Sequence, residues 1–266
     1  MSETTIGLIG FGAIGREVAA QLAANGPGSP AIVALNRSTP NDAPGLRFVQ
    51  RTAELIAAMP SLVIEAAGHA AVSEHVVTVL QAGIPVVLAS VGALADDDLR
   101  SRVEAAAAKG NTGLILAGGA IGGVDYLRAV ARLPNLKVRY CSRKPIAAWV
   151  KELAERGHAL DEIDGEMVLF EGSAREAALS FPQNLNVAMT LALAGPGVDG
   201  IAVRVVADSN AKGNTHEIDI ESSAGRARLV FENAPSPTNP KTSALTALSI
   251  VQAVREHLKL GRPSAS

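Results

Sequence analysis

The sequence predicts an α/β fold in which a doubly wound parallel sheet is followed by a second α+β domain with a mixed or antiparallel sheet. Two observations support this prediction. Over residues 4–119, short apolar runs typical of buried strands alternate with amphipathic stretches typical of helices. Beyond residue 119, strand-like segments follow one another with few long helices between them. The chain has 266 residues, of which 48% are hydrophobic, so it is long enough for two such domains.

The first domain is expected to contain five strands connected by crossover helices. Strands are predicted at residues 4–10, 31–36, 61–67, 84–90 and 111–119, and the main helices at 13–25, 69–83 and 96–110. Parallel strands require crossovers of this kind, because the chain must return to the same end of the sheet. The helix at 96–110 begins with three aspartates, which complement the positive end of its dipole.

The second domain is expected to be rich in strands. They are predicted at residues 136–144, 165–173, 201–209, 215–223 and 226–234. A strongly amphipathic helix at 241–261 follows a proline-rich stretch and is expected to pack back on the first domain. The predicted domains are therefore residues 1–119 with 240–266, and residues 120–239.

Composition and charge exclude several classes of function. The formal net charge is −2 at pH 7, so no long-range field attracts the chain to nucleic acid or to an anionic membrane. No apolar run approaches the roughly 20 residues of a membrane-spanning helix. The lone cysteine, Cys141, cannot form an internal disulfide, and the N-terminus enters a strand without a leader, which indicates a reducing, cytoplasmic setting. No metal site is predicted.

The strongest local motif is GLIGFGAIG, which has the spacing G-x-G-x-x-G. It directly follows a predicted strand and opens a helix, which is the context of a Rossmann-type dinucleotide site. Gly10 would make the tight turn, Gly12 would let backbone approach a pyrophosphate, and Gly15 would let helix and strand pack closely. Ala13 and Ile14 complete the helix start, where phosphates bind. The alternative is a close-packed strand-to-helix turn that binds no ligand.

The second predicted strand ends in ALNRS, where the motif departs from its simplest NAD form. An acidic residue that binds the ribose 2′-hydroxyl is expected here, but this chain has Asn36 followed by Arg37. An arginine at this position can pair with a 2′-phosphate. The sequence therefore predicts use of NADP, or of both NAD and NADP, unless Arg37 is only a solvated loop residue.

Two histidines are candidates for proton transfer near pH 7. His69 begins a predicted helix at the carboxyl edge of the first sheet, where it would cap the helix or line a cofactor site. His216 lies in a strand whose alternation places it on the same side as Ile218 and Ile220, so it is expected to face inward. An inward histidine is either a satisfied core residue or a general base beside a cleft, and spacing alone does not decide between them.

Three other segments could bind substrate or cofactor. GGAIGG, residues 118–123, lets backbone approach a ligand closely or serves only as the crossover between domains. Arg143 and Lys144 stand side by side and suit carboxylate recognition, although such residues are often simply solvated. Asn184 and Asn186 lie near a predicted helix start, where an amide caps the helix or binds a carboxamide.

Taken in order along the chain, these segments resemble the L-aspartate dehydrogenase family. The resemblance covers nearly the whole chain and rests on the glycine motif together with ASVGAL, GGAIGG, SRKPIAAW, LFEGSAREAA, FPQNLNVAMTLALAG, VRVVADSNAKGNTHEI and FENAPSPTNPKTSALTALSIV. It implies a Rossmann domain and a mixed α/β catalytic domain that also forms a homodimer, similar to homoserine dehydrogenase. It implies oxidation of L-aspartate with NAD or NADP to iminoaspartate, which gives oxaloacetate and ammonia in water or feeds NAD synthesis.

The resemblance also implies roles for single residues. His216, in NTHE, matches the family's catalytic residue, expected to act as general base on the substrate ammonium or on the water that attacks the imine. Ala120 and Asn186 match positions that hold the nicotinamide cofactor. With this substrate, Lys144 and Arg143 become candidates for neutralising its carboxylates. Two alternatives remain open: another nicotinamide enzyme, such as a homoserine dehydrogenase or an imine reductase, and a dinucleotide-sensing module without catalysis.

Overall fold

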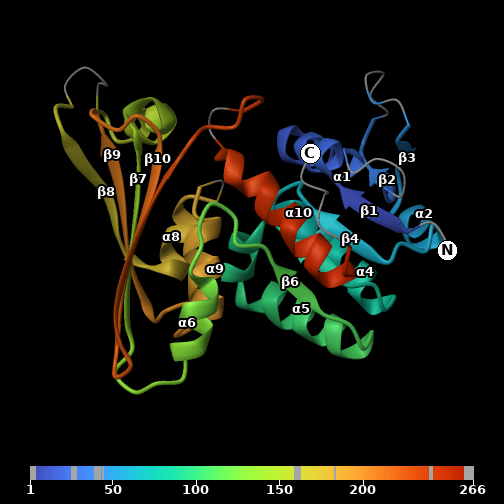
Figure 1. Ribbon diagram of the computed structural model, residues 1–266. Coiled ribbons are helices and arrows are strands. Elements are labelled where there is room, and N and C mark those ends of the chain that lie inside the picture. Colours follow the sequence, from blue (N-terminus) through green and yellow to red (C-terminus); the bar gives the residue numbers. More distant parts are fainter. Residues whose placement is uncertain are drawn as a thin grey trace. The chain divides into compact units, whose positions relative to one another are not determined.

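The chain divides into two compact units (Figure 1). The computed structural model describes residues 4–24, 29–38, 43, 45–158, 163–182, 184–239 and 242–260. Residues 1–119 and 246–266 form unit 1, and residues 120–245 form unit 2. Unit 1 is therefore discontinuous in the sequence, because the last helix returns to it.

Unit 1 is built on a six-stranded parallel sheet in the order β3-β2-β1-β4-β5-β6. Its strands are β1 (Thr5–Ile9), β2 (Ala31–Leu35), β3 (Arg47–Val49), β4 (Leu62–Glu65), β5 (Val86–Leu88) and β6 (Leu114–Leu116). The strand order reverses between β1 and β4, which confirms the predicted doubly wound sheet. The edge strand β3 is an addition to the prediction, because three residues are too few to show a strand period.

Helices connect these strands as crossovers. They are α1 (Ala13–Ala23), α2 (Thr52–Ala57), α3 (His69–Ala71), the π-helical η1 (Val72–Val76), α4 (Val77–Gln81), the 3₁₀-helical η2 (Val91–Ala95) and α5 (Asp97–Lys109). The predicted helix at 69–83 is thus observed as three joined helical segments. At the start of α5 the Asp96 carboxylate accepts a hydrogen bond of 3.0 Å from the Leu99 N–H, which caps one of the free donors of the first turn.

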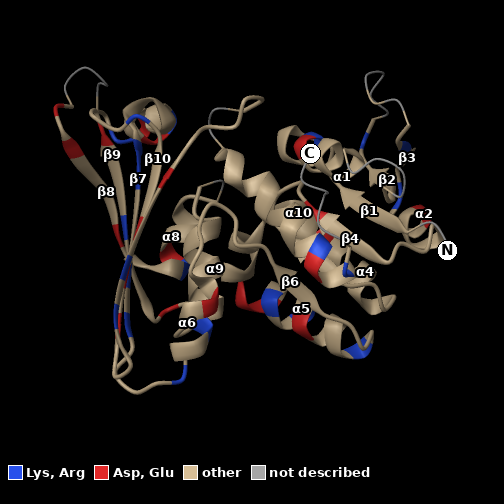
Figure 2. Ribbon diagram, viewed as in Figure 1, with Lys and Arg blue, Asp and Glu red and all other residues tan. Residues whose placement is uncertain are grey.

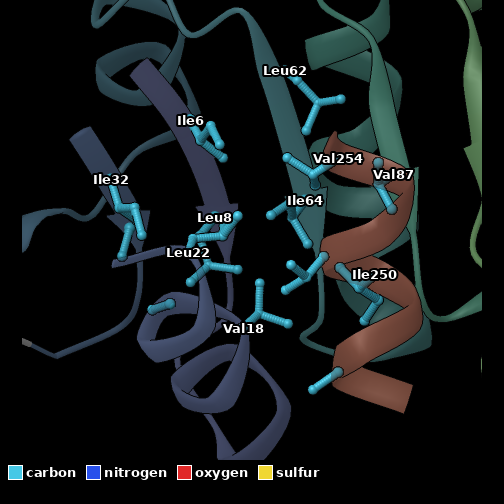
Figure 3. Packing of buried hydrophobic residues seen from close by; sticks show 14 of the residues in the cluster. Ile6, Leu8, Val18, Leu22, Ile32, Leu62, Ile64, Val87, Ile250 and Val254 are labelled. Atoms are coloured by element: carbon cyan, nitrogen blue, oxygen red, sulfur yellow. The ribbon is translucent and has the colours of Figure 1, made fainter. Parts of the chain in front are cut away.

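The last helix, α10 (Ala244–Leu258), contributes to the core of unit 1. Figure 3 shows Ile250 and Val254 turned toward the sheet, where Ile64 and Val87 lie, and all four side chains are fully buried. Burying an aliphatic side chain of this size stabilises the fold by about 1.5–3 kcal/mol. The apolar stripe of α10 therefore explains why the chain returns to unit 1.

Unit 2 contains a five-stranded mixed sheet in the order β11-β10-β7-β9-β8. Its strands are β7 (Lys137–Pro145), β8 (Glu166–Ser173), β9 (Ile201–Asp208), β10 (Asn214–Ser222) and β11 (Gly225–Asn233). β7 and β9 run parallel, whereas the other neighbours are antiparallel. The mixed sheet predicted from the run of strands is confirmed.

The helices of unit 2 are α6 (Val124–Val130), η3 (Ile146–Trp149), α7 (Val150–Glu155), α8 (Ala174–Ser180) and α9 (Asn186–Ala194). Of these, α8 and α9 pack on the sheet from the same side (Figure 1). α8 begins with a capping box in which the Ser173 side chain accepts from the Glu176 N–H and the Glu176 carboxylate accepts from the Ser173 N–H. Small apolar residues make α9 almost wholly buried, so it packs closely beside the sheet.

Neither unit gathers charge of one sign. Figure 2 shows Lys and Arg interspersed with Asp and Glu along α5 and along the strands of the second sheet. In the parts of the chain that the structure describes, no helix is both long enough and apolar enough to cross a bilayer.

Candidate active site

The three glycines of the first turn differ in what a side chain at each position would meet. Gly10 has a positive φ of 91°, and a Cβ there would lie 2.6 Å from the Ala67 Cβ. A Cβ on Gly15 would lie 2.2 Å from the Gly10 carbonyl oxygen, so any side chain would separate α1 from β1. A Cβ on Gly12 would meet nothing within 4 Å. Gly10 and Gly15 are therefore required by packing within unit 1, whereas the space over Gly12 is open.

The open space over Gly12 lies at the start of α1. Gly12 is the N-cap residue and supplies no capping side chain, and no acidic residue lies in the first turn. The N–H groups of Ala13 and Ile14 precede the first intrahelical bond, which runs from the Arg16 N–H to the Gly12 carbonyl at 2.9 Å. Uncapped donors, a favourable helix dipole and open space together fit a pyrophosphate.

The end of β2 lacks a carboxylate. The side-chain oxygen of Asn36 accepts from the Phe11 N–H at 3.4 Å, and its amide donates to the Ser38 carbonyl at 2.7 Å. Asn36 thus connects the glycine turn to the loop after β2. Arg37 is exposed beside it, which leaves its guanidinium accessible to a 2′-phosphate.

Glu65, at the end of β4, is an organising residue that the sequence analysis missed. It is fully buried and accepts hydrogen bonds from the N–H groups of Ala67, Gly68 and Ser90 and from the Ser90 hydroxyl, at 2.8–3.0 Å. Burial raises the pKa of Glu65, and these hydrogen bonds oppose the rise. This single carboxylate connects the loops that follow β4 and β5, at the carboxyl edge where ligands bind. An acid at the end of an otherwise apolar strand is the signal that could have revealed it.

In unit 2, a polar cluster lies on the buried face of β7 and β10. His216 pairs in register with Ser142, and the two strands place Tyr140, Ser142, Lys144 and His216 on the same side. The Tyr140 hydroxyl lies 2.8 Å from His216 Nδ1, and the two rings are stacked at 12°. The inward orientation predicted for His216 is confirmed, with only 4% of the residue exposed.

Lys144 is the cation of this cluster. Its ammonium donates to the Asn184 side-chain oxygen at 2.7 Å and lies 5.2 Å from the centre of the Trp149 ring. No carboxylate among the described residues forms an ion pair with it. Burial lowers the pKa of Lys144 to about 8, and the more distant Glu152 opposes this shift. Lys144 is therefore a buried cation that lacks a counter-ion.

His216 is neutral over the whole range near pH 7. Burial lowers its pKa to about 3, and the positive charge of Lys144 adds to this shift. Nδ1 is occupied by the Tyr140 hydroxyl, so Nε2 is the nitrogen that remains for a ligand. A dianionic ligand that neutralises Lys144 would remove part of the cause of the low pKa and make His216 a stronger base.

The structure corrects the expectation for Arg143. Its side chain points to the opposite face of the sheet from Lys144 and forms ion pairs of 2.5, 3.0 and 3.3 Å with Glu166, Asp208 and Glu217. Burial alone would lower the pKa of Arg143, but hydrogen bonds to these carboxylates outweigh it and raise the pKa. A guanidinium already held by three acids cannot also neutralise a substrate carboxylate, so the assignment to substrate is wrong.

The remaining predicted residues lie in several places. The Ala120 carbonyl accepts from the Asn233 amide at 2.7 Å, and Asn186 begins α9. The glycine-rich crossover packs on β11, because a Cβ on Gly123 would lie 2.5 Å from the Leu229 side chain. His69 begins α3 in unit 1 and is half-buried. Among the described side chains, no group of three or more His, Cys, Asp or Glu could hold a metal ion.

These groups define what the chain can do chemically. The start of α1 suits a dinucleotide phosphate, Lys144 suits a carboxylate, and Nε2 of His216 can accept a proton from a group that becomes acidic in the reaction. This set of groups fits proton transfer on a carboxylic acid substrate by a protein that also binds a dinucleotide.

Comparison with known proteins gives consistent matches. Residues 125–257 match the family described as "Aspartate dehydrogenase, C-terminal", and residues 10–117 match "Homoserine dehydrogenase, NAD binding domain". The chain is 46% identical to L-aspartate dehydrogenase 2 of Bordetella bronchiseptica over 95% of this chain and 96% of that protein. It is 41% identical to L-aspartate dehydrogenase of Ruegeria pomeroyi over 97% and 94%. The crystal structure of aspartate dehydrogenase from Thermotoga maritima matches with a TM-score of 0.74 and 26% identity, covering 97% of this chain and 96% of that one.

Proposed function

This chain belongs to the aspartate dehydrogenase family, and on that premise we propose how its residues carry out the reaction. The protein is an enzyme that oxidises L-aspartate with NAD or NADP to iminoaspartate, which water converts to oxaloacetate and ammonia. The observation that carries the residue assignment is the buried cluster of Tyr140, Lys144 and His216, which combines a cation without a counter-ion and a neutral imidazole. We further propose that iminoaspartate serves as a precursor for NAD synthesis.

The dinucleotide would be held by the first turn of unit 1. Gly12, Ala13 and Ile14 offer open space and backbone donors to the pyrophosphate, with Gly10 and Gly15 shaping the turn. Asn36 and Arg37 would contact the adenosine ribose, and the exposed Arg37 supports use of NADP as well as NAD. The dinucleotide held there would supply the nicotinamide ring as acceptor for the hydride that leaves Cα of aspartate.

Ala120 and Asn186 would hold the nicotinamide end of the cofactor. The support is that both match family positions and that both are held in place within unit 2. The Ala120 carbonyl is anchored by the Asn233 amide, and Asn186 occupies the first position of a buried helix. A backbone carbonyl and a side-chain amide can both bind a carboxamide.

Lys144 would bind a substrate carboxylate. A buried ammonium without an acid partner is costly, and an incoming carboxylate lowers that cost by forming charge-assisted hydrogen bonds. Asn184 fixes the ammonium by accepting one of its three protons, so the other two can point to a ligand. Because Arg143 points to the opposite face of the sheet, Lys144 is the principal cation proposed for the substrate site.

His216 would act as general base through Nε2. It would accept a proton from the substrate ammonium, or from the water that attacks the imine. The imidazole is neutral, and its hydrogen bond with the Tyr140 hydroxyl through Nδ1 fixes the ring, so that Nε2 is the nitrogen left for the substrate. The negative charge of bound aspartate near Lys144 would raise the basicity of Nε2 when it is needed.

The experiment that tests this function is steady-state kinetics of His216→Gln, with His69→Gln as the matched control in unit 1. L-Aspartate and L-homoserine are supplied with NAD and with NADP, and reduced nicotinamide is followed by absorbance. We expect turnover of L-aspartate alone, a kcat for His216→Gln reduced by about 1,000-fold, cofactor affinity unchanged, and near-normal kcat for His69→Gln. Near-normal turnover by His216→Gln would overturn the assignment.

A homodimer formed through unit 2 is also proposed. The sheet face opposite α8 and α9 supports it, because a depression of about 660 Å³ opens there between Arg139, Glu171 and Asp219, and Val230 is 51% exposed. Light scattering after gel filtration tests the assembly: Val230→Arg should yield a monomer, and Leu179→Arg, on the exposed side of α8, should not. A wild-type monomer would contradict the proposal.

A reducing, cytoplasmic setting is the compartment we propose. Cys141 is half-buried and is a free cysteine. Burial raises the pKa of its thiol, and the negative charge of Glu217 adds to the rise, so the thiol is protonated and unreactive near neutral pH. Cell fractionation checks this proposal.

A further inference from the structure

Two buried hydroxyls adjoin His216, and that of Ser142 has no role in the proposed function. Tyr140 and Ser142 follow each other on the inward face of β7, and Ser142 is the register partner of His216. The Tyr140 hydroxyl bonds to His216 Nδ1 at 2.8 Å. The Ser142 hydroxyl is fully buried and makes no hydrogen bond of ordinary geometry with any described group. An unsatisfied hydroxyl in a core is costly, so its presence calls for an explanation.

The hydrogen bond between Tyr140 and His216 permits two arrangements of their protons. Burial raises the pKa of Tyr140, and the nearby Ser142 hydroxyl opposes part of the rise, so the phenol keeps its proton. His216 is neutral and carries one ring proton. Only one proton can lie between the phenol oxygen and Nδ1. If the phenol donates it, the ring proton of His216 is on Nε2; if Nδ1 donates it, Nε2 is bare and the phenol proton must turn to another acceptor.

In the second arrangement, the Ser142 hydroxyl oxygen would accept the phenol proton of Tyr140. Ser142 stands two residues from Tyr140 on the same strand face and in register with His216, and its hydroxyl makes no other hydrogen bond among the described residues. A rotation of the phenol O–H therefore exchanges an acceptor on His216 for an acceptor on Ser142.

We propose that Tyr140 and Ser142 form a hydroxyl pair that selects the tautomer of His216. With the phenol donating to Nδ1, Nε2 carries a proton and cannot act as a base. With the phenol donating to Ser142, Nδ1 donates to the phenol oxygen and Nε2 presents its lone pair. Tyr140 and Ser142 are thus positioning residues, and this inference rests on the proposed role of His216.

The proton balance of the base step follows from this pairing. A bond between the proton and Nε2 forms while the N–H bond of the substrate ammonium, or the O–H bond of water, breaks. The resulting imidazolium keeps its Nδ1–H bond to the phenol oxygen, which in turn donates to Ser142. The proton on Nε2 later leaves to solvent. Among the described residues, Lys144 is the charged side chain that acts on the ring; it faces the ring from β7 and opposes protonation until a substrate carboxylate neutralises it.

The test compares Tyr140→Phe, Ser142→Ala and the double variant. Phenylalanine fills the same volume and removes only the hydroxyl. We expect kcat to fall about tenfold for Tyr140→Phe and about threefold for Ser142→Ala, with the KM for L-aspartate nearly unchanged. Because Ser142 acts through Tyr140, Ser142→Ala should have no further effect in the Tyr140→Phe background. Additive losses, or wild-type kcat in either single variant, would overturn the proposal.

A second readout does not depend on activity. In protein labelled with ¹⁵N-histidine, the shifts of the two ring nitrogens report which one is protonated, and His216→Gln assigns the signal among the five histidines. The wild type without substrate should show protonated Nε2, and Tyr140→Phe should show a mixture of tautomers. If the folded Tyr140→Phe variant has the same tautomer as the wild type, the proposal is contradicted, whatever the activity of the variant. An active His216→Gln enzyme refutes the proposed function, whereas an inactive one with a normal Tyr140→Phe variant refutes only this inference.

Discussion

Arg143 and Lys144 are adjacent cations on one strand, yet the two faces of β7 give them opposite environments. On the outer face, the Arg143 guanidinium is held by Glu166, Asp208 and Glu217. On the inner face, Lys144 is more deeply buried and has one carboxamide, that of Asn184, as its hydrogen-bond partner. A satisfied cation stabilises the fold, whereas a buried one without a counter-ion is costly and is retained where a ligand supplies the missing charge.

The largest effect is expected when the inner cation, Lys144, is removed. Lys144→Met should lower kcat/KM for L-aspartate about 100-fold, mainly through KM, because a charge-assisted hydrogen bond to a carboxylate is lost. The free energy of unfolding should rise, since a buried charge without a partner disappears. Kinetics and urea titration measure the two effects. Lys144→Arg is the matched control for charge, and an unchanged KM in Lys144→Met would remove Lys144 from the substrate site.

Removing the outer cation should have the converse effect. Arg143→Met leaves three carboxylates close together without their cation, so the free energy of unfolding should fall by about 2 kcal/mol, less than for a fully buried network because Glu166 is partly exposed. The KM for L-aspartate should change less than about twofold. Urea titration and kinetics are again the measurements. A large rise in KM with unchanged stability would reverse the roles of the two faces.

The pH dependence should also separate the two faces. The pKa of Lys144 is lowered by burial from 10.5 to about 8, so between these values the unfolded chain holds a proton that the folded chain has released. The free energy of unfolding should therefore rise with pH, by about 2 kcal/mol between pH 8 and 9.5 at about 1.4 kcal/mol per pH unit. Affinity for L-aspartate should fall over the same range. Equal pH slopes of stability in wild type and Lys144→Met would contradict this assignment.

The smallest effect on substrate binding is expected at Asn184, which orients the Lys144 ammonium. Asn184→Ala should raise the KM for L-aspartate about threefold to fivefold, because the ammonium loses the acceptor that fixes it but keeps its charge. Asn184→Asp should lower affinity for the dianionic substrate more strongly, since it supplies the counter-ion that the ligand would otherwise provide. Isothermal titration with the competitive dianion succinate measures both. Tighter binding by Asn184→Asp would show that Lys144 does not face the substrate.

Much of the fold followed from local pattern. The alternation of apolar runs and amphipathic stretches predicted five of the six strands of unit 1 and all five strands of unit 2. The short strand β3 had too few residues to show a period, and α8 was overlooked although its capping box, from Ser173 to Glu176, was a readable signal. Periods of 2 and 3.6 residues belong to contiguous chain, so they can be read without knowing the partners.

The glycine turn shows which contacts a local sequence motif can predict. The roles expected for Gly10 and Gly15 agree with the clashes that a Cβ would make in unit 1. The role of Glu65 could not be derived from the motif, because its hydrogen bonds reach Ser90, which lies 25 residues further along the chain. Contacts of this kind depend on which strands become neighbours in the sheet.

The inward orientation of His216 could be predicted from strand alternation, which places it with Ile218 and Ile220. Alternation also puts Arg143 and Lys144 on opposite faces of their strand, but it does not show which groups each side chain meets there. The tertiary structure supplies these groups, because it brings acids from β8, β9 and β10 to one face and Asn184 to the other. The physical reason is that the cost of a buried charge depends on neighbours distant in sequence.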